Sequence, residues 1–179
     1  MIIIGAGGLA KQMLSTISNT RNESFMFFDD VTATSSFLSK YEVLKDKQVL
    51  IDRIKGGESY CLGIGDPKNR FRLYMELNGY KSPETIISEE ALISEDGVSI
   101  DEGVVILPQV IVEPDVTIGK GSLVNVKVAI THDVSVGEFC EIGPGVMLLG
   151  RSSIGNGVMI GAGAIVMPRV KVGDHSIIG

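Results

Sequence analysis

A histidine followed by an aspartate, His132–Asp133, is the pair in this sequence best suited to acid–base chemistry. Only two histidines occur in the chain, and a neutral imidazole can remove a proton from an attacking group near pH 7. A neighbouring carboxylate can orient the imidazole, but adjacent residues on a strand point to opposite sides, so the pairing requires a corner or a neighbouring subunit. The alternative is that both are ordinary surface residues. The other histidine, His175, is expected to face solvent.

A glycine-rich turn near the N-terminus is suited to binding phosphate. Ile2–Ile4 is typical of a strand, and Gly5–Gly8 leads into a helix that we expect to continue to about Ser18. Backbone N–H groups at a helix N-terminus can donate to phosphate oxygens, although any tight strand-to-helix turn also uses glycines. The next apolar strand, Phe25–Phe28, ends at Asp29–Asp30, which is typical of a strand-ending turn.

The second half of the chain repeats every six residues. From Ile100 to Ile178 each sixth residue is Ile, Leu or Val, and the position four residues later is small or short. This pattern indicates a short strand plus a corner, with three such units in each triangular coil. Coils stack about 4.8 Å apart, so the aliphatic side chains should form ladders along the axis. Ile87 and Ile93 are one residue out of phase, which predicts a one-residue insertion near Asp96–Gly97.

The N-terminal part has the pattern of a small α/β unit instead. Residues Tyr60–Gly65 indicate another buried strand, followed by a helix from about Pro67 to Leu77 that stops at Gly79. The fold class is therefore a small Rossmann-like βαβαβ unit followed by an all-β parallel β-helix. We place the α/β domain at residues 1–83 and the β-helix domain at residues 84–179.

Composition and charge exclude several classes of function. The formal net charge is −6 and no Lys or Arg cluster occurs in the sequence, so we expect no nucleic-acid partner. No apolar run approaches the ~18 residues of a membrane span, and the chain begins directly with a strand-like segment, so a cytoplasmic protein is expected. Cys61 and Cys140 cannot form a disulfide framework and lack metal-site spacing, which predicts two core cysteines and no metal.

With these features placed, the chain resembles the NeuD/PglD-type sugar O- or N-acetyltransferases of the hexapeptide-repeat acyltransferase superfamily. The likeness is carried by "IIIGAGGLAK", "FFDD", "GIGDPKNR", "VNVKVAITHDVSVGEF" and "IGAGAIV". The resemblance implies that the β-helix is left-handed and that the protein is a homotrimer with active sites between neighbouring subunits. It also implies acetyl-CoA as a co-substrate along the coils and a nucleotide-linked amino sugar held by the N-terminal unit.

The resemblance also assigns roles to individual residues. His132 would be the general base and Asp133 its orienting partner. The residues that would bind the nucleotide-linked substrate are Gly7, Gly8, Leu9, Asp29, Asp30, Gly65 and Asn125. The residues that would contact acetyl-CoA are Glu141, Gly150 and Ala162. For Asn125, Asp29 and Asp30 a turn role, and for Gly150 a coil-corner role, are the alternatives that the residue types allow.

Two features depart from the family pattern. Glu141 stands where relatives often carry a histidine near the acyl group, and the chain ends at Gly179 in mid-coil, which predicts that the usual C-terminal coil and tail are missing. The expected function is acetyl-CoA-dependent N-acetylation of a nucleotide-activated amino sugar, a UDP-4-amino-4,6-dideoxy sugar, in surface glycan synthesis. The alternatives are an O-acetyltransferase acting on sialic acid or another sugar, and a non-catalytic nucleotide-binding β-helix. The sequence does not specify the nucleotide, the sugar or the acyl length.

Overall fold

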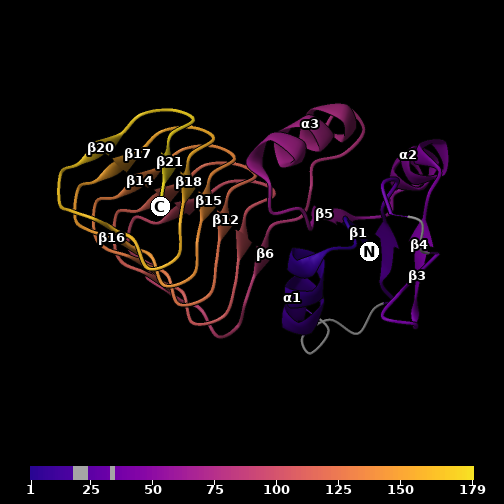
Figure 1. Cartoon of the computed structure of the whole chain (residues 1–179), viewed down its shortest axis with the longest axis horizontal. Helices are drawn as coiled ribbons and strands as arrows, with labels where there is room; N and C mark the ends of the chain where they lie inside the picture. The colour runs from indigo at the N-terminus through magenta and orange to yellow at the C-terminus, as the bar shows by residue number, and fades with distance from the viewer. Residues whose placement is uncertain (18–23, 33–34) are drawn as a thin grey trace.

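In the computed structural model of the chain, which describes residues 1–17, 24–32 and 35–179, an α/β unit is joined to a long β-helix (Figure 1). The sheet of the α/β unit has the strand order β3-β4-β2-β1-β5, with only the edge strand β3 antiparallel. Its strands are β1 (Ile2–Ile4), β2 (Met26–Phe28), β3 (Ser36–Phe37), β4 (Tyr41–Leu44) and β5 (Tyr60–Leu62). The predicted helix end at Ser18 lies outside the described residues.

Helices cover both faces of this sheet, so the predicted α/β unit is confirmed. The helices are α1 (Gly8–Ile17), α2 (Lys47–Lys55) and α3 (Pro67–Leu77). Ile3 packs with α1 on one face, whereas Ile2 and Ile4 pack with α2 and α3 on the other, because successive strand residues point to opposite sides. Strands β3 and β4 and helix α2 were not predicted, since their short apolar segments show no decisive periodicity.

The β-helix consists of two-residue strands stacked into three parallel sheets, which form the three faces of a prism. The first face contains β6 (Ile86–Ile87), β9 (Val105–Ile106), β12 (Leu123–Val124), β15 (Glu141–Ile142), β18 (Met159–Ile160) and β21 (Ile177–Ile178). The second face contains β7 (Leu92–Ile93), β10 (Ile111–Val112), β13 (Ala129–Ile130), β16 (Met147–Leu148) and β19 (Ile165–Val166). The third face contains β8 (Ser99–Ile100), β11 (Thr117–Ile118), β14 (Ser135–Val136), β17 (Ser153–Ile154) and β20 (Lys171–Val172).

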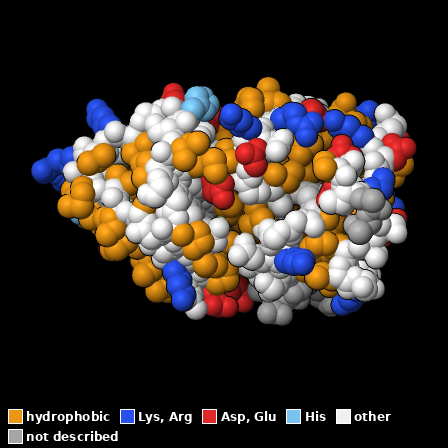
Figure 2. All heavy atoms as spheres, in the orientation of Figure 1, with side chains coloured by type: hydrophobic (Ala, Val, Ile, Leu, Met, Phe, Trp, Pro, Cys, Tyr) orange, Lys and Arg blue, Asp and Glu red, His pale blue; other side chains and the backbone are white. Residues whose placement is uncertain are grey.

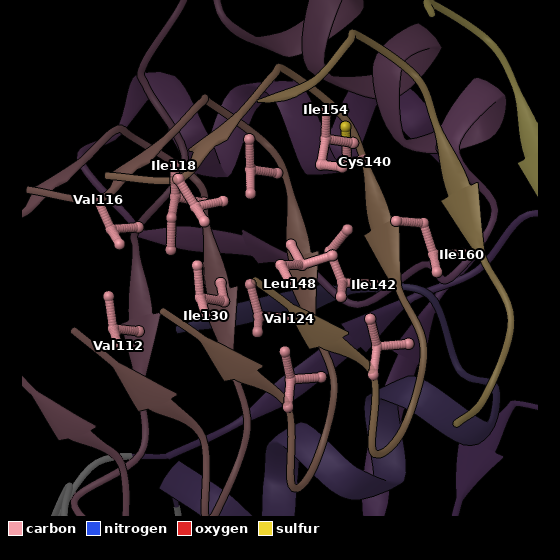
Figure 3. Close-up of a cluster of buried hydrophobic side chains, with 14 of the residues drawn as sticks. Val112, Val116, Ile118, Val124, Ile130, Cys140, Ile142, Leu148, Ile154 and Ile160 are labelled. Atoms are coloured by element: carbon pink, nitrogen blue, oxygen red, sulfur yellow. The ribbon is translucent and has the colours of Figure 1, made fainter. Parts of the chain in front are cut away.

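The core of the prism is the predicted set of aliphatic ladders. Figure 3 shows inward side chains such as Ile118, Ile130 and Ile142 stacked between the three faces, and all three are buried. On the second face, Val112 pairs with Ile130 one full coil later in the chain. Ile93 also pairs with Val112, but the chain between these two residues is one residue longer than the chain between Val112 and Ile130. The predicted one-residue insertion before Ile100 is therefore confirmed.

The α/β unit packs on the first face of the prism at its N-terminal end. Ile86, Val105 and Leu123 point outward from this face and are buried against a cluster that includes α1. On the same outward row, Ile177 in the last coil is 78% exposed, because the α/β unit covers only the earlier coils. The last helix, α3, ends at Leu77, and the first strand of the coils, β6, begins at Ile86. The domain boundary that we propose at residue 83 lies between them.

Candidate active site

The His132–Asp133 pair lies at a corner of the prism, in the turn between β13 on the second face and β14 on the third. We name this edge of the prism the histidine corner. Asp133 has a backbone φ of 61°, and its carboxylate Oδ2 lies 2.8 Å from His132 Nδ1. The left-handed backbone at the corner thus places two adjacent side chains together, as the sequence required. Both side chains are exposed, so His132 projects outward from the prism.

The coils above and below hold the histidine in place. The His132 backbone N–H donates to Glu113 one coil below, and the carbonyl of His132 accepts from the Arg151 N–H one coil above. Gly150 lies directly against the imidazole: a Cβ added there would be 2.9 Å from His132 Nε2. Any larger residue at position 150 would therefore displace the imidazole from this position.

The electrostatics of the corner favour an ionised aspartate. The hydrogen bond with His132 is the main cause that lowers the pKa of Asp133, and Arg151, with Nε 3.5 Å from Asp133 Oδ2, lowers it further. If His132 donates to this carboxylate through Nδ1, its Nε2 is left as the proton acceptor. In that tautomer Nε2 can accept a proton beside Gly150, and the role of His132 as a general base stays a prediction.

A second feature is a cavity of about 330 Å³ at the carboxyl ends of β1, β2 and β5. This is the edge at which open parallel sheets commonly bind ligands. Six predicted substrate-binding residues line it, namely Gly7, Gly8, Leu9, Asp29, Asp30 and Gly65. The structure brings these residues together, and their binding role stays a prediction.

Asp29 also has the turn role that the sequence allowed. Its Oδ1 accepts from the backbone N–H groups of Val31 and Thr32. Burial raises the pKa of this carboxyl, but the two backbone hydrogen bonds and Lys45 together lower it below its usual value. Asp29 therefore fixes the loop after β2 while contributing a carboxylate to the cavity wall.

Arg70 is a residue of the site region that the sequence analysis missed. Its guanidinium is buried and donates to four backbone carbonyls at 2.5–2.7 Å, those of Ile64, Gly65, Gly121 and Cys140. Two of these carbonyls belong to the cavity wall and two to the β-helix, so one side chain joins the two units. Burial lowers the pKa of Arg70 to about 10, which leaves it charged at neutral pH. An arginine within a helical pattern gives no signal of such a role.

The remaining predicted residues lie on the first face or at its edge. Glu141 is half-buried on β15, and a Cβ added at Gly65 would lie 3.8 Å from its Oε1, so this carboxylate is beside the cavity wall. Burial raises the pKa of Glu141, and the nearby Arg70 opposes that rise.

Asn125 is buried at the corner between the first face and the second, and its Oδ1 accepts a hydrogen bond from the next backbone N–H. The turn role of Asn125 is thus visible, and its substrate role stays a prediction.

Ala162 is exposed at the same edge of the prism, which we name the glycine corner after Gly145 and Gly163. This corner joins the first face to the second, whereas the histidine corner joins the second to the third. The histidine corner is therefore the edge opposite the first face. In a single chain, the His132–Asp133 pair and the cavity beside Glu141 lie on different sides of the prism.

Cys140 has the core role predicted for it. Its side chain is buried beside the carbonyl of Gly155, and burial raises the pKa of the thiol. Cys61 is buried in β5 as well. Within residues 1–17, 24–32 and 35–179, no group of three or more His, Cys, Asp or Glu side chains is placed to hold a metal ion. In the same ranges, no helix has the length and apolar character needed to cross a bilayer.

Two family models match the chain in the order in which its units occur. Residues 1–77 match the PglD N-terminal domain, and residues 151–179 match the bacterial transferase hexapeptide (six repeats). A comparison with curated protein sequences gives no significant match.

Several solved structures share the whole fold. The acetyltransferase domain of PglB from Neisseria gonorrhoeae, in complex with acetyl coenzyme A, has a TM-score of 0.83 and 21% identity, over 98% of this chain and 93% of that one. PerB from Caulobacter crescentus, in complex with CoA and GDP-perosamine, has a TM-score of 0.76 and 26% identity, over 99% and 93%. WeeI from Acinetobacter baumannii has a TM-score of 0.72 and 21% identity, over 96% and 92%.

The fold and the site define an enzyme of the hexapeptide-repeat acyltransferase class, built on a left-handed parallel β-helix. The N-terminal unit narrows the class further, because it matches the PglD N-terminal domain and leads directly into the coils. The chain therefore combines a PglD-type N-terminal domain with the hexapeptide-repeat coils of an acyltransferase.

Proposed function

We propose that this enzyme transfers an acetyl group from acetyl-CoA to the amine of a nucleotide-linked amino sugar, with His132 as the general base. The observation that carries this proposal is the His132–Asp133 pair, whose Nε2 lies against Gly150 on a coil corner. The likeness to PerB, which was solved with CoA and GDP-perosamine, supports the choice of substrates. The proposed acceptor is a UDP-linked 4-amino-4,6-dideoxy sugar used for surface glycans.

The proposed reaction is direct attack without a covalent enzyme intermediate. The acceptor amine attacks the thioester carbonyl and forms the new C–N bond, His132 Nε2 takes the amine proton, and CoA leaves as the thiolate. The backbone N–H of Gly150 donates to no other residue that the structure describes, so it is free to donate to the developing oxyanion. Cys140 cannot serve as a nucleophile because its thiol is buried and its pKa is raised.

The proposed site requires more than one copy of the chain. The cavity, Glu141 and Asn125 lie on or beside the first face, and His132 lies on the opposite edge. The second face supplies a surface through which copies could pack, because its outward row is apolar along its entire length. This row consists of Leu92, Ile111, Ala129, Met147 and Ile165, and four of its five members are large hydrophobics that are 41–69% exposed.

The outward-facing positions of the third face are polar, unlike those of the second face. Its outward row is polar and consists of Ser99, Thr117, Ser135, Ser153 and Lys171. An apolar row that crosses five coils favours burial against another protein surface. In a threefold arrangement with the second faces inward, the histidine corner of each copy meets the glycine corner of its neighbour. That arrangement would place Asn125 and Ala162 of one copy beside His132 and Gly150 of the next, so we propose a homotrimer.

The test is CoA thiol release by the purified full chain with acetyl-CoA and a panel of UDP-, dTDP- and GDP-linked amino sugars, with sialic acid as a hydroxyl acceptor. Release with one amino sugar that falls by about 10²–10⁴-fold in His132→Ala supports the proposal. Release with sialic acid alone would replace it with O-acetylation. Release that His132→Ala leaves unchanged would exclude the histidine as the base. A nucleotide sugar that raises the melting temperature without turnover would indicate a binding protein.

A further inference from the structure

The histidine corner carries a column of charged side chains whose sign changes along the prism axis. With φ between 59° and 63°, the same corner position in four successive coils is occupied by Asp115, Asp133, Arg151 and Arg169. Equivalent positions of a parallel β-helix stack about 4.8 Å apart. Glu113, half-buried one coil below His132, adds a third carboxylate. The column is therefore negative up to the coil of His132 and positive in the coils above it.

The glycine corner carries a cation, Lys127, at the level of the negative part of this column. In the next coils the equivalent positions are glycines, Gly145 and Gly163. Lys127 and Asp115 are both exposed, and neither forms an ion pair within the residues that the structure describes. The two corners are opposite edges of the second face, so a direct contact between these side chains requires a second copy of the chain.

The trimer proposed above brings the two corners together. Copies related by a threefold axis parallel to the prism have the same residue at the same height. Because successive corners rise by a third of a coil, Lys127 lies about 1.6 Å below the level of Asp133 in the next copy and about 3.2 Å above that of Asp115. The ammonium group therefore faces two carboxylates of its neighbour.

We infer that Lys127 of each copy forms ion pairs with Asp115 and Asp133 of the next copy, and that this contact fixes the register in which the coils pack. This inference rests on the proposed function, which includes the trimer. Figure 2 shows hydrophobic side chains along the lower left of the molecule, where Figure 1 places β16 of the second face. Such a row repeats with every coil, so apolar packing alone selects no register. Through Asp133, which contacts His132, each active site then borders a residue of a second copy.

Charge distinguishes the register that closes a ring from the shifted ones. A shift of one coil upward would move Lys127 from the level of Asp115 and Asp133 to that of Asp133 and Arg151, where like charges repel. A shift of one coil downward would leave it Asp115 but remove Asp133. Contacts shifted along the axis do not close and would build an open filament. The closed register is the one in which Lys127 faces two carboxylates.

A charge swap across the interface tests the inference. Lys127→Glu and Asp115→Lys each place like charges together, and the double variant restores an opposite pair. Both corners accept these side chains, because Lys127 itself has φ 60° and Asp115 has φ 59°. Sedimentation velocity over a range of concentrations measures assembly of the full chain. Lys171→Glu, on the outward row of the third face, is the control and should sediment as the wild type does.

The expected effect of removing the cation is a weaker trimer. An exposed ion pair changes an equilibrium constant about 3-fold, and a trimer contains three such contacts, so Lys127→Ala should raise its dissociation constant about 30-fold. Lys127→Arg should keep the wild-type value. Thiol release per subunit by Lys127→Ala should rise with enzyme concentration, because the proposed site is shared between copies. The double variant should assemble more tightly than either single reversal.

Each outcome decides one point. Single reversals that sediment as the wild type does overturn the inference and leave the proposed function intact. Weakening in both single reversals without recovery in the double variant shows that the two side chains do not face each other, which also overturns it. A wild-type chain that remains a monomer at all concentrations, with acetyl-CoA and the acceptor present, removes the proposed trimer itself.

Discussion

Replacing Arg70 by methionine should remove the clamp between the two units of the protein. Methionine retains much of the side-chain volume but none of the five N–H donors. Four backbone carbonyls, at 2.5–2.7 Å from the guanidinium, would lose their partner. Because Arg70 is only 1% exposed, water cannot replace these bonds without opening the interface.

The expected loss of stability follows from these contacts. A hydrogen bond to a charged group contributes about 1.5–3 kcal/mol, so four bonds give an upper limit of about 6–12 kcal/mol. The bonds share one desolvated guanidinium, whose own burial cost is removed with it, and each buried carbonyl left without a partner costs about 1–3 kcal/mol. We therefore expect Arg70→Met to lower the free energy of unfolding by about 4 kcal/mol, a large part of the roughly 5–15 kcal/mol of a typical domain.

Urea unfolding followed by circular dichroism measures this loss, and Arg72→Met on the same helix is the matched control. The Arg72 side chain is 52% exposed and pairs with Glu76 at 3.2 Å, so its loss should cost less than about 1 kcal/mol. Arg70→Lys should fall between the two variants, because lysine keeps the charge but not the fork of donors. A change below about 1 kcal/mol in Arg70→Met would refute the role given to these four hydrogen bonds.

Three further predictions concern catalysis, assembly and pH. Gly150→Ala should lower kcat at least about 10-fold, because its Cβ would overlap the His132 ring. Ile111→Glu on the second face should dissociate the proposed trimer in sedimentation experiments and abolish turnover, since it places a charge in the apolar row. Tyr74 donates to Glu102, and Tyr74→Phe should cost about 1 kcal/mol of stability near pH 7. Hydrogen bonds from Ser82 and then Tyr74 lower the pKa of Glu102, so this stabilisation is present above its usual value of 4.5 and is lost as pH falls through the lowered pKa.

Each of these predictions has a control and a contrary outcome. Gly173→Ala meets only a serine oxygen at 3.9 Å and should leave kcat unchanged, and equal kinetics in Gly150→Ala would contradict the placement of the histidine. Thr117→Glu on the third face should leave the oligomer intact, and a trimer that tolerates Ile111→Glu would argue against packing through the second face. If the effect of Tyr74→Phe were the same at pH 7 and at pH values below the Glu102 titration, the bond to the carboxylate would not be its cause.

The α/β unit was only partly predictable. Ile2–Ile4 and the glycine turn after it were recognised because a continuous apolar run followed by glycines has few other interpretations. Strand β4 and helix α2 were missed, although Asp46 caps α2 by accepting from two backbone N–H groups. Their apolar residues are too few to fix a period, and only packing against the sheet selects their conformation.

The sequence by itself determined the prism, because a six-residue period of aliphatic and small residues can be buried only by stacking coils. It also determined the candidate base, since few residues other than His132 can accept a proton near pH 7. The tertiary structure decided which groups meet. Arg151 and Arg169 become neighbours only because the chain between them makes one full coil, as it does between the paired residues Thr117 and Ser135. Arg70 likewise finds its carbonyl partners in distant segments, including the carbonyl of Cys140 in the β-helix. Such contacts follow from how the coils and the α/β unit pack, which no local pattern encodes.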